Sequence, residues 1–165
     1  MKKLIAIVIL ACTLNATMAQ GNKSVFFEVG GNGLGFSANF DSRFTKSEKG
    51  FGFRAGVGFI PPIDAIIFAT PFILTVPLAI NHLAGNGANY FESGIGVTYI
   101  HSSRGVAFFE DELDDAAIST IAIVPSIAYR HAKTGKAAQW RAVISPLLVD
   151  GTVAFWAGIS IGYKF

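Results

Sequence analysis

The chain has 165 residues, of which 52% are hydrophobic and only 15% are charged, whereas about a quarter of the residues in a typical soluble domain are charged. Two of the thirteen basic residues, Lys2 and Lys3, lie at the very start, which leaves eleven basic residues against eleven acidic ones. This composition favours a membrane protein and provides no basic surface for nucleic acid.

The first 19 residues have the three parts of a secretory signal peptide. Two lysines precede an apolar run, and Thr17-Met18-Ala19 supplies a small-residue cleavage site. We therefore expect a cleaved signal peptide over residues 1–19 and one domain over residues 20–165. A transmembrane helix is an alternative, although the run is shorter than the ~20 residues of a span. Lipoprotein-type cleavage at Cys12, the single cysteine, is another.

After this leader, apolar residues recur at every second position in eight stretches, as they do in strands whose two faces meet different surroundings. The stretches cover residues 23–30, 36–41, 51–59, 72–80, 91–99, 121–129, 139–145 and 153–165. The third is the most regular, since large apolar residues alternate with glycines and Arg54. Gly31-Asn32-Gly33 predicts a tight turn after the first, because these residues tolerate positive φ.

The apolar run from Ala65 to Ile80 is the strongest challenge to an all-β interpretation, because it could form a membrane helix. It is shorter than the usual threshold of about 18 residues and contains Pro71 and Pro77. We interpret it as a hydrophobic loop that leads into the fourth strand. A helical or re-entrant piece near residues 63–69 is the alternative.

The last stretch places apolar residues from Val153 to Phe165 on one face and mostly small or polar residues on the other. A membrane-spanning strand needs ~9–11 residues, with lipid on one side and the barrel interior on the other. A lipocalin-like soluble barrel, with the large residues inside, would turn a face rich in glycine toward water. The sequence therefore predicts an all-β fold: a closed, eight-stranded, antiparallel up-and-down transmembrane β-barrel with a packed polar interior.

Two segments carry a family resemblance. Ile161, Tyr163 and Phe165 resemble the closing-strand signal read by the outer-membrane barrel assembly machinery, and the first strand with the overall pattern resembles small, porin-like OmpA/OmpX-type outer-membrane barrels. The resemblance implies a Gram-negative cell envelope, secretion to the periplasm, insertion into the outer membrane by that machinery, and contact with outer-membrane lipid or lipopolysaccharide. We also expect a monomer.

The lengths of the connections predict the orientation, because outer-membrane barrels keep short periplasmic turns and longer extracellular loops. If the chain enters from the periplasm, the turns near residues 46, 86 and 134 are periplasmic and short. The longer loops, near residues 61–70 and 102–117, then lie outside.

Four charged residues fall on the inward faces of odd-numbered strands: Glu28, Arg54, Glu92 and Arg141. Their signs alternate around the barrel, and an unpaired buried charge costs several kcal/mol. We interpret them as an interior network of ion pairs that fills the barrel. The alternatives are the lining of a narrow ion channel and a glutamate that acts as a general acid.

One pattern resembles an enzyme site. His101 and Ser103 share the outward face at the extracellular rim, where Glu112 or Asp115 could orient the histidine for acyl transfer. Tyr99-Ile-His-Ser-Ser103 resembles the His-x-Ser motif of outer-membrane lipid A deacylases. That family continues with Asn and a small residue, whereas Arg104-Gly105 stand here, so a polar strand end that leads into a solvated loop is the simpler interpretation.

No cofactor or metal site is expected, although the acidic run of residues 110–115 could offer oxygen ligands to calcium. Five aromatic residues near strand ends predict an interfacial girdle: Tyr90, Tyr99, Tyr129, Trp140 and Tyr163. The sequence thus favours a structural or adhesive role through the extracellular loops, with an unidentified extracellular ligand. Lipid A deacylation and a narrow channel are the alternatives.

Overall fold

The computed structural model describes residues 22–64, 69–103, 117–133 and 137–165, so the expected signal peptide lies outside the described residues. In these ranges, no helix is long and apolar enough to cross a membrane.

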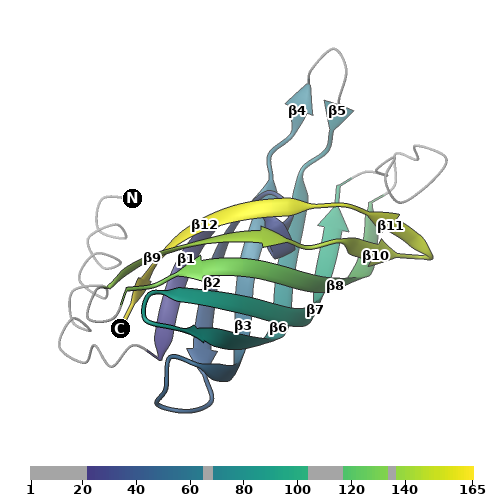
Figure 1. Ribbon diagram of the computed structural model, residues 1–165. Coiled ribbons are helices and arrows are strands. Elements are labelled where there is room, and N and C mark those ends of the chain that lie inside the picture. Colours follow the sequence, from purple (N-terminus) through teal and green to yellow (C-terminus); the bar gives the residue numbers. More distant parts are fainter. Residues whose placement is uncertain (1–21, 65–68, 104–116, 134–136) are drawn as a thin grey trace, which may run out of the picture.

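Eight antiparallel strands close into a barrel, which confirms the predicted fold (Figure 1). The continuous strands are β1 (Lys23–Gly30), β2 (Phe36–Arg43), β3 (Gly50–Ile60), β6 (Ile73–Asn86), β7 (Asn89–Ser102) and β8 (Ile118–His131). The last two are interrupted and consist of β9 (Ala138–Ile144) with β10 (Leu147–Val149), and β11 (Thr152–Ala154) with β12 (Ala157–Lys164). Pairing of β1 with β12, with Glu28 opposite Ser160, closes the barrel.

The two interruptions lie side by side. Ser145 and Pro146 separate β9 from β10, and Phe155 and Trp156 separate β11 from β12. The backbone N–H of Ser145 donates to the carbonyl of Trp156 across the gap, at 2.8 Å. This hydrogen bond therefore connects the two strands at the position where both are interrupted.

The apolar run from Ala65 to Ile80, which could have formed a membrane helix, contains strands in its described part. β4 (Ile63–Asp64) and β5 (Ala69–Thr70) pair as a short hairpin that projects beyond the barrel (Figure 1), and β6 begins at Ile73. A helix over residues 63–69 is therefore wrong at both ends of that segment. Residues 65–68 lie outside the described residues.

The barrel has two distinct ends, which we name by their connections. The turn end holds the connections of residues 44–49, 87–88 and 132–137, together with Lys23 and Lys164. The loop end holds the connections of residues 31–35, 61–72, 103–117 and 150–151. The longer connections thus gather at one end, as the sequence predicted.

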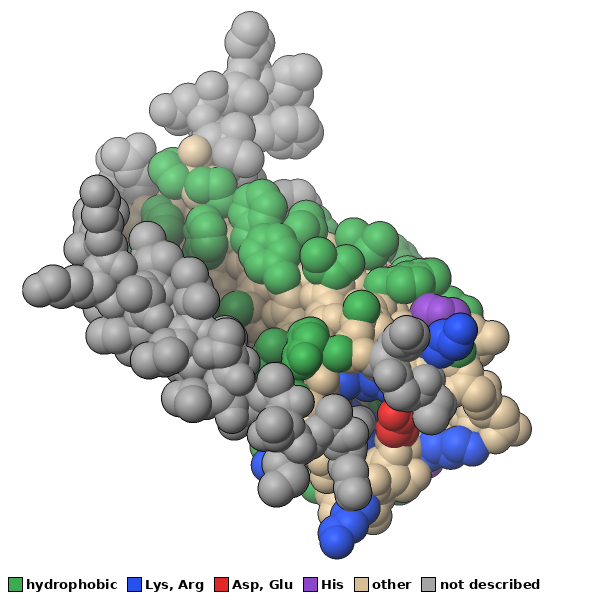
Figure 2. Space-filling model, turned by 90° about the vertical axis from the view of Figure 1, so that its left-hand side faces the viewer, with side chains coloured by type: hydrophobic (Ala, Val, Ile, Leu, Met, Phe, Trp, Pro, Cys, Tyr) green, Lys and Arg blue, Asp and Glu red, His purple; other side chains and the backbone are tan. Residues whose placement is uncertain are grey.

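The outer wall is apolar, and Figure 2 shows hydrophobic side chains spread over one side of it. Large side chains on the outward positions are strongly exposed, with Val57 at 61% and Ile161 at 64%. A soluble protein rarely exposes a contiguous apolar surface of this extent. The alternation of apolar outward and small or polar inward residues is that of a strand between lipid and lumen.

The lumen is divided into two halves of different chemistry. The half near the turn end is polar, but the half near the loop end holds an apolar cluster: Leu34, Ile73, Ile100, Ala122, Val124, Leu147 and Val149. The expectation of a polar interior is therefore right only in part. Strands β6, β7, β8 and β10 contribute these apolar side chains, which lie beside buried but uncharged Thr75 and Thr98.

Candidate functional site

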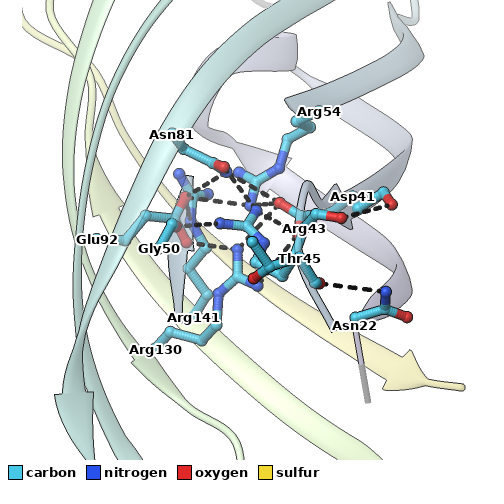
Figure 3. A network of polar contacts seen from close by, with 11 residues as sticks. Asn22, Asp41, Arg43, Thr45, Gly50, Arg54, Asn81, Glu92, Arg130 and Arg141 are labelled. Carbon is cyan, nitrogen blue, oxygen red and sulfur yellow. Dashed lines mark hydrogen bonds and ion pairs between the residues drawn. The ribbon is translucent and has the colours of Figure 1, made fainter. Parts of the chain in front are cut away.

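The four inward charges predicted from the sequence lie buried in the lumen and are linked by ion pairs. Figure 3 shows three of them, Arg54, Glu92 and Arg141. Arg141 bonds Glu28 at 2.6 Å and Glu92 at 3.1 Å. Arg54 bonds the same oxygen of Glu92 at 3.1 Å. Every second strand thus contributes one charge, with alternating sign, at a similar height in the barrel. Each of these charges is paired.

A second acidic centre was missing from the prediction. Asp41 on β2 bonds Arg43 at 2.6 Å, Arg54 at 3.1 Å and Arg130 at 3.2 Å, and Arg130 also pairs with Glu92. These residues follow the same inward alternation on even-numbered strands. Extending the alternation to the last residues of β2 and β8 would have found them.

An amide and an aromatic ring complete the network. Asn81 donates to Asp41 at 2.9 Å and accepts from Arg43 at 2.6 Å, so it bridges the two charges. The Phe26 ring lies 5.1 Å from the Arg54 guanidinium and 4.9 Å from that of Arg130, at distances typical of cation–π contacts. Four arginines and three carboxylates therefore form one connected network of buried ion pairs.

The turn end of the lumen is capped by the β2–β3 connection. Glu48 from this connection accepts from Lys164 at 2.9 Å and from the Tyr90 hydroxyl at 3.0 Å, which reaches it from β7. Glu48, Tyr90 and Lys164 line a cavity of about 10 Å³, which holds about one water molecule. Tyr90 is 4% exposed and points inward, so its assignment to the outer aromatic girdle was wrong.

The loop end is plugged by the turn after β1. Gly31-Asn32-Gly33 forms a 3-10 turn, η1 (Gly31–Gly33), that is buried in the lumen. Thr98 donates to the carbonyl of Asn32, Thr75 to that of Gly33, and the Trp156 indole to that of Leu34, each at 2.9 Å. The predicted tight turn exists, but it folds into the barrel instead of lying at its surface.

At the loop-end rim, His101 contacts a serine other than the predicted one. Its Nδ1 lies 2.9 Å from the hydroxyl of Ser119 on β8, and the Tyr99 hydroxyl donates to the same oxygen at 3.1 Å. Ser103 is exposed, and its backbone N–H donates to Phe72 across the sheet edge. Sequence reasoning could not find Ser119, because the β7–β8 register brings it beside His101.

Glu112 and Asp115, the carboxylates considered for this histidine, lie outside the described residues, as does the whole acidic run of residues 110–115. Within the described part of the chain, no group of three His, Cys, Asp or Glu side chains is placed to hold a metal ion.

The residues that we expect to form the closing-strand signal lie along the barrel seam. Ile161 and Tyr163 are exposed on the outer wall of β12, 64% and 48% respectively. The backbone N–H of Phe165 donates to the carbonyl of Lys23 at 2.9 Å and extends the seam by one residue. The other predicted girdle residues, Tyr99, Tyr129 and Trp140, also point outward.

A closed eight-stranded barrel with an apolar outer wall and a filled lumen defines a small transmembrane β-barrel of the outer-membrane type. No protein-family model matches the chain, and no curated protein matches it either. Its fold is similar to that of the N-terminal β-barrel domain of Pseudomonas aeruginosa OprF, with a TM-score of 0.63 and 9% identity over 87% of this chain and 96% of that one.

The chain is also similar to the outer membrane protein Ail of Yersinia pestis, whose backbone structure was determined in phospholipid bilayer nanodiscs. The TM-score is 0.56 with 9% identity over 88% of this chain and 99% of Ail. At this identity the likeness concerns the fold, which supports the predicted OmpA/OmpX-type architecture.

Proposed function

We propose that this outer-membrane barrel is an anchor whose loop end binds an extracellular partner in an adhesive or surface-binding role. The filled lumen carries this proposal. The Glu48 cap, the arginine–carboxylate network and the η1 plug follow one another along the axis. A lumen filled in this way argues against the channel alternative. The function is then carried by the outer surfaces of the barrel.

In this proposal the turn end lies in the periplasm. The leader directs export, and the assembly machinery inserts the barrel as a monomer through β12. The connections at the loop end are then the contact surface. They carry seven acidic residues and one basic residue, Arg104. The acidic residues are Asp64, Glu110, Asp111, Glu112, Asp114, Asp115 and Asp150. Charge complementarity therefore favours a partner with a basic surface.

The test uses the barrel in nanodiscs of zwitterionic lipid and a decalysine peptide as the basic probe. Replacing the five acids of residues 110–115 by their amides should weaken peptide binding roughly tenfold at low salt, because rim charges dominate such association. The matched control is His101→Ala, which leaves the acidic charges in place and should bind like wild type. Equal binding by the amide variant would refute a loop-based acidic contact surface.

A second candidate, acyl hydrolysis at the loop-end rim, has a specific observation in its favour. Tyr99 donates to Ser119, so the Ser119 hydroxyl is free to donate to Nδ1 of His101, which is the first requirement of a serine nucleophile. The test is the mass spectrum of lipid A from cells that express the wild type, His101→Ala or Ser119→Ala. This candidate expects an acyl chain to be lost with the wild type alone, whereas unchanged lipid A in all three would remove it.

A further inference from the structure

The charges inside the lumen do not balance. The network joins four arginines, all labelled in Figure 3, to three carboxylates, and Glu48 of the cap pairs with Lys164, so positive charges outnumber negative ones by one. In the described part of the chain, the buried acidic side chains are those of Glu28, Asp41 and Glu92 alone. A buried charge without a counter-charge is costly in a low-dielectric interior. The lumen therefore needs one more negative charge.

The cavity of about 10 Å³ at the turn end lies where the network meets the Glu48 cap. Five charged side chains line it, of which the first three are positive: Arg43, Arg130, Lys164, Asp41 and Glu48. Around the cavity, too, positive charges outnumber negative ones by one. Apart from Glu48, these side chains belong to residues that are at most 6% exposed, so the excess charge is largely removed from bulk solvent.

Three residues that line this cavity carry N–H groups without an acceptor. Gln139 is 5% exposed, and neither of its side-chain amide atoms has a hydrogen-bond partner among the described residues. The same holds for the Nε atoms of Arg43 and Arg130. Buried polar groups nearly always have a partner. Unsatisfied donors on three residues around one cavity therefore indicate an acceptor that the protein does not itself supply.

We propose that this cavity is a binding site for a single monatomic anion, chloride. The ion accepts hydrogen bonds from the N–H groups of Gln139, Arg43 and Arg130, and its negative charge balances the excess positive charge of the lumen. The cavity has room for about one water-sized particle, which excludes polyatomic anions such as gluconate. A water molecule would also fit and could bond the amide, but it would leave the positive charge uncompensated.

The test is urea unfolding of the refolded barrel at increasing chloride concentration, with sodium gluconate added to keep the ionic strength constant. Binding of one ion to the folded state alone should lower the unfolding equilibrium constant about tenfold for each tenfold rise in chloride above the dissociation constant. In crystals soaked in bromide, anomalous scattering should place one bromide between Arg43, Arg130 and Gln139. A wild type whose unfolding does not depend on chloride would overturn the proposal, as would soaked crystals without bromide in the cavity. Neither result needs a variant that must fold.

Three variants separate this site from general salt effects. Gln139→Leu should weaken the chloride response without lowering stability in gluconate, because the amide that it removes has no protein partner. Arg43→Gln removes the excess positive charge and should abolish the response. The matched control is Lys46→Gln, which removes the same charge from an exposed side chain of the β2–β3 connection outside the cavity and should respond like wild type. Equal responses of Arg43→Gln and Lys46→Gln would rule out the site, because chloride would then act on the surface charge in general.

Discussion

Arg141→Ala should destabilise the barrel by about 3–5 kcal/mol, the range found when one partner of a buried ion pair is removed. Arg141 is fully buried and is the cation paired with Glu28. The second carboxylate oxygen of Glu28 has no partner among the described residues. Without Arg141, Glu28 would be a buried charge without an ion-pair partner, which is the costly state. Reversible urea unfolding of the refolded barrel measures the loss.

Two further variants make this prediction specific. Arg54→Ala should cost less, about 1–3 kcal/mol, because Asp41 and Glu92 each keep two other arginines. Adding Glu28→Gln to Arg141→Ala should restore part of the lost stability, since the stranded charge is then gone. An Arg141→Ala variant no less stable than Arg54→Ala would contradict the idea that partner number sets the cost.

The sequence was sufficient for the fold because each strand carries its own signal. Alternation of period two fixed which residues face lipid, and no long-range information was needed for Ile161 or Val57 to be placed outward. The same local rule assigned Arg54 and Arg141 to the lumen. Outward and inward faces are properties of a single strand.

The features that escaped prediction depend on the register between strands or on a change of direction in the chain. Ser119 meets His101 only through the pairing of β7 with β8. In sequence, the η1 turn resembles an ordinary surface hairpin, because its glycines predict positive φ. They do not predict whether the turn folds into the lumen or away from it. The apolar cluster that surrounds it explains the inward course, since Leu34 from the turn joins residues from four strands, β6, β7, β8 and β10.

Gly158 leaves the space that the η1 turn occupies in the lumen. A Cβ built on Gly158 would lie 2.7 Å from the Cα of Gly31 and would also collide with the Gly31 backbone nitrogen. Gly158 has no positive φ to explain it, so the requirement is for space. The β12 strand therefore carries glycine where the turn crosses its inner face.

Gly158→Val should expel the η1 turn and cost about 3 kcal/mol, the upper part of the range for overpacking a filled interior. Trp156 reports the event directly, because its indole donates to the Leu34 carbonyl beside the turn. In a Trp140→Phe background, we expect the emission of Trp156 to shift to longer wavelength as water enters the loop half of the lumen. Ala157→Val is the matched control, since the adjacent residue is exposed on the outer wall. If Gly158→Val refolds with unshifted emission and unchanged stability, close packing of the turn against β12 does not hold the plug in place.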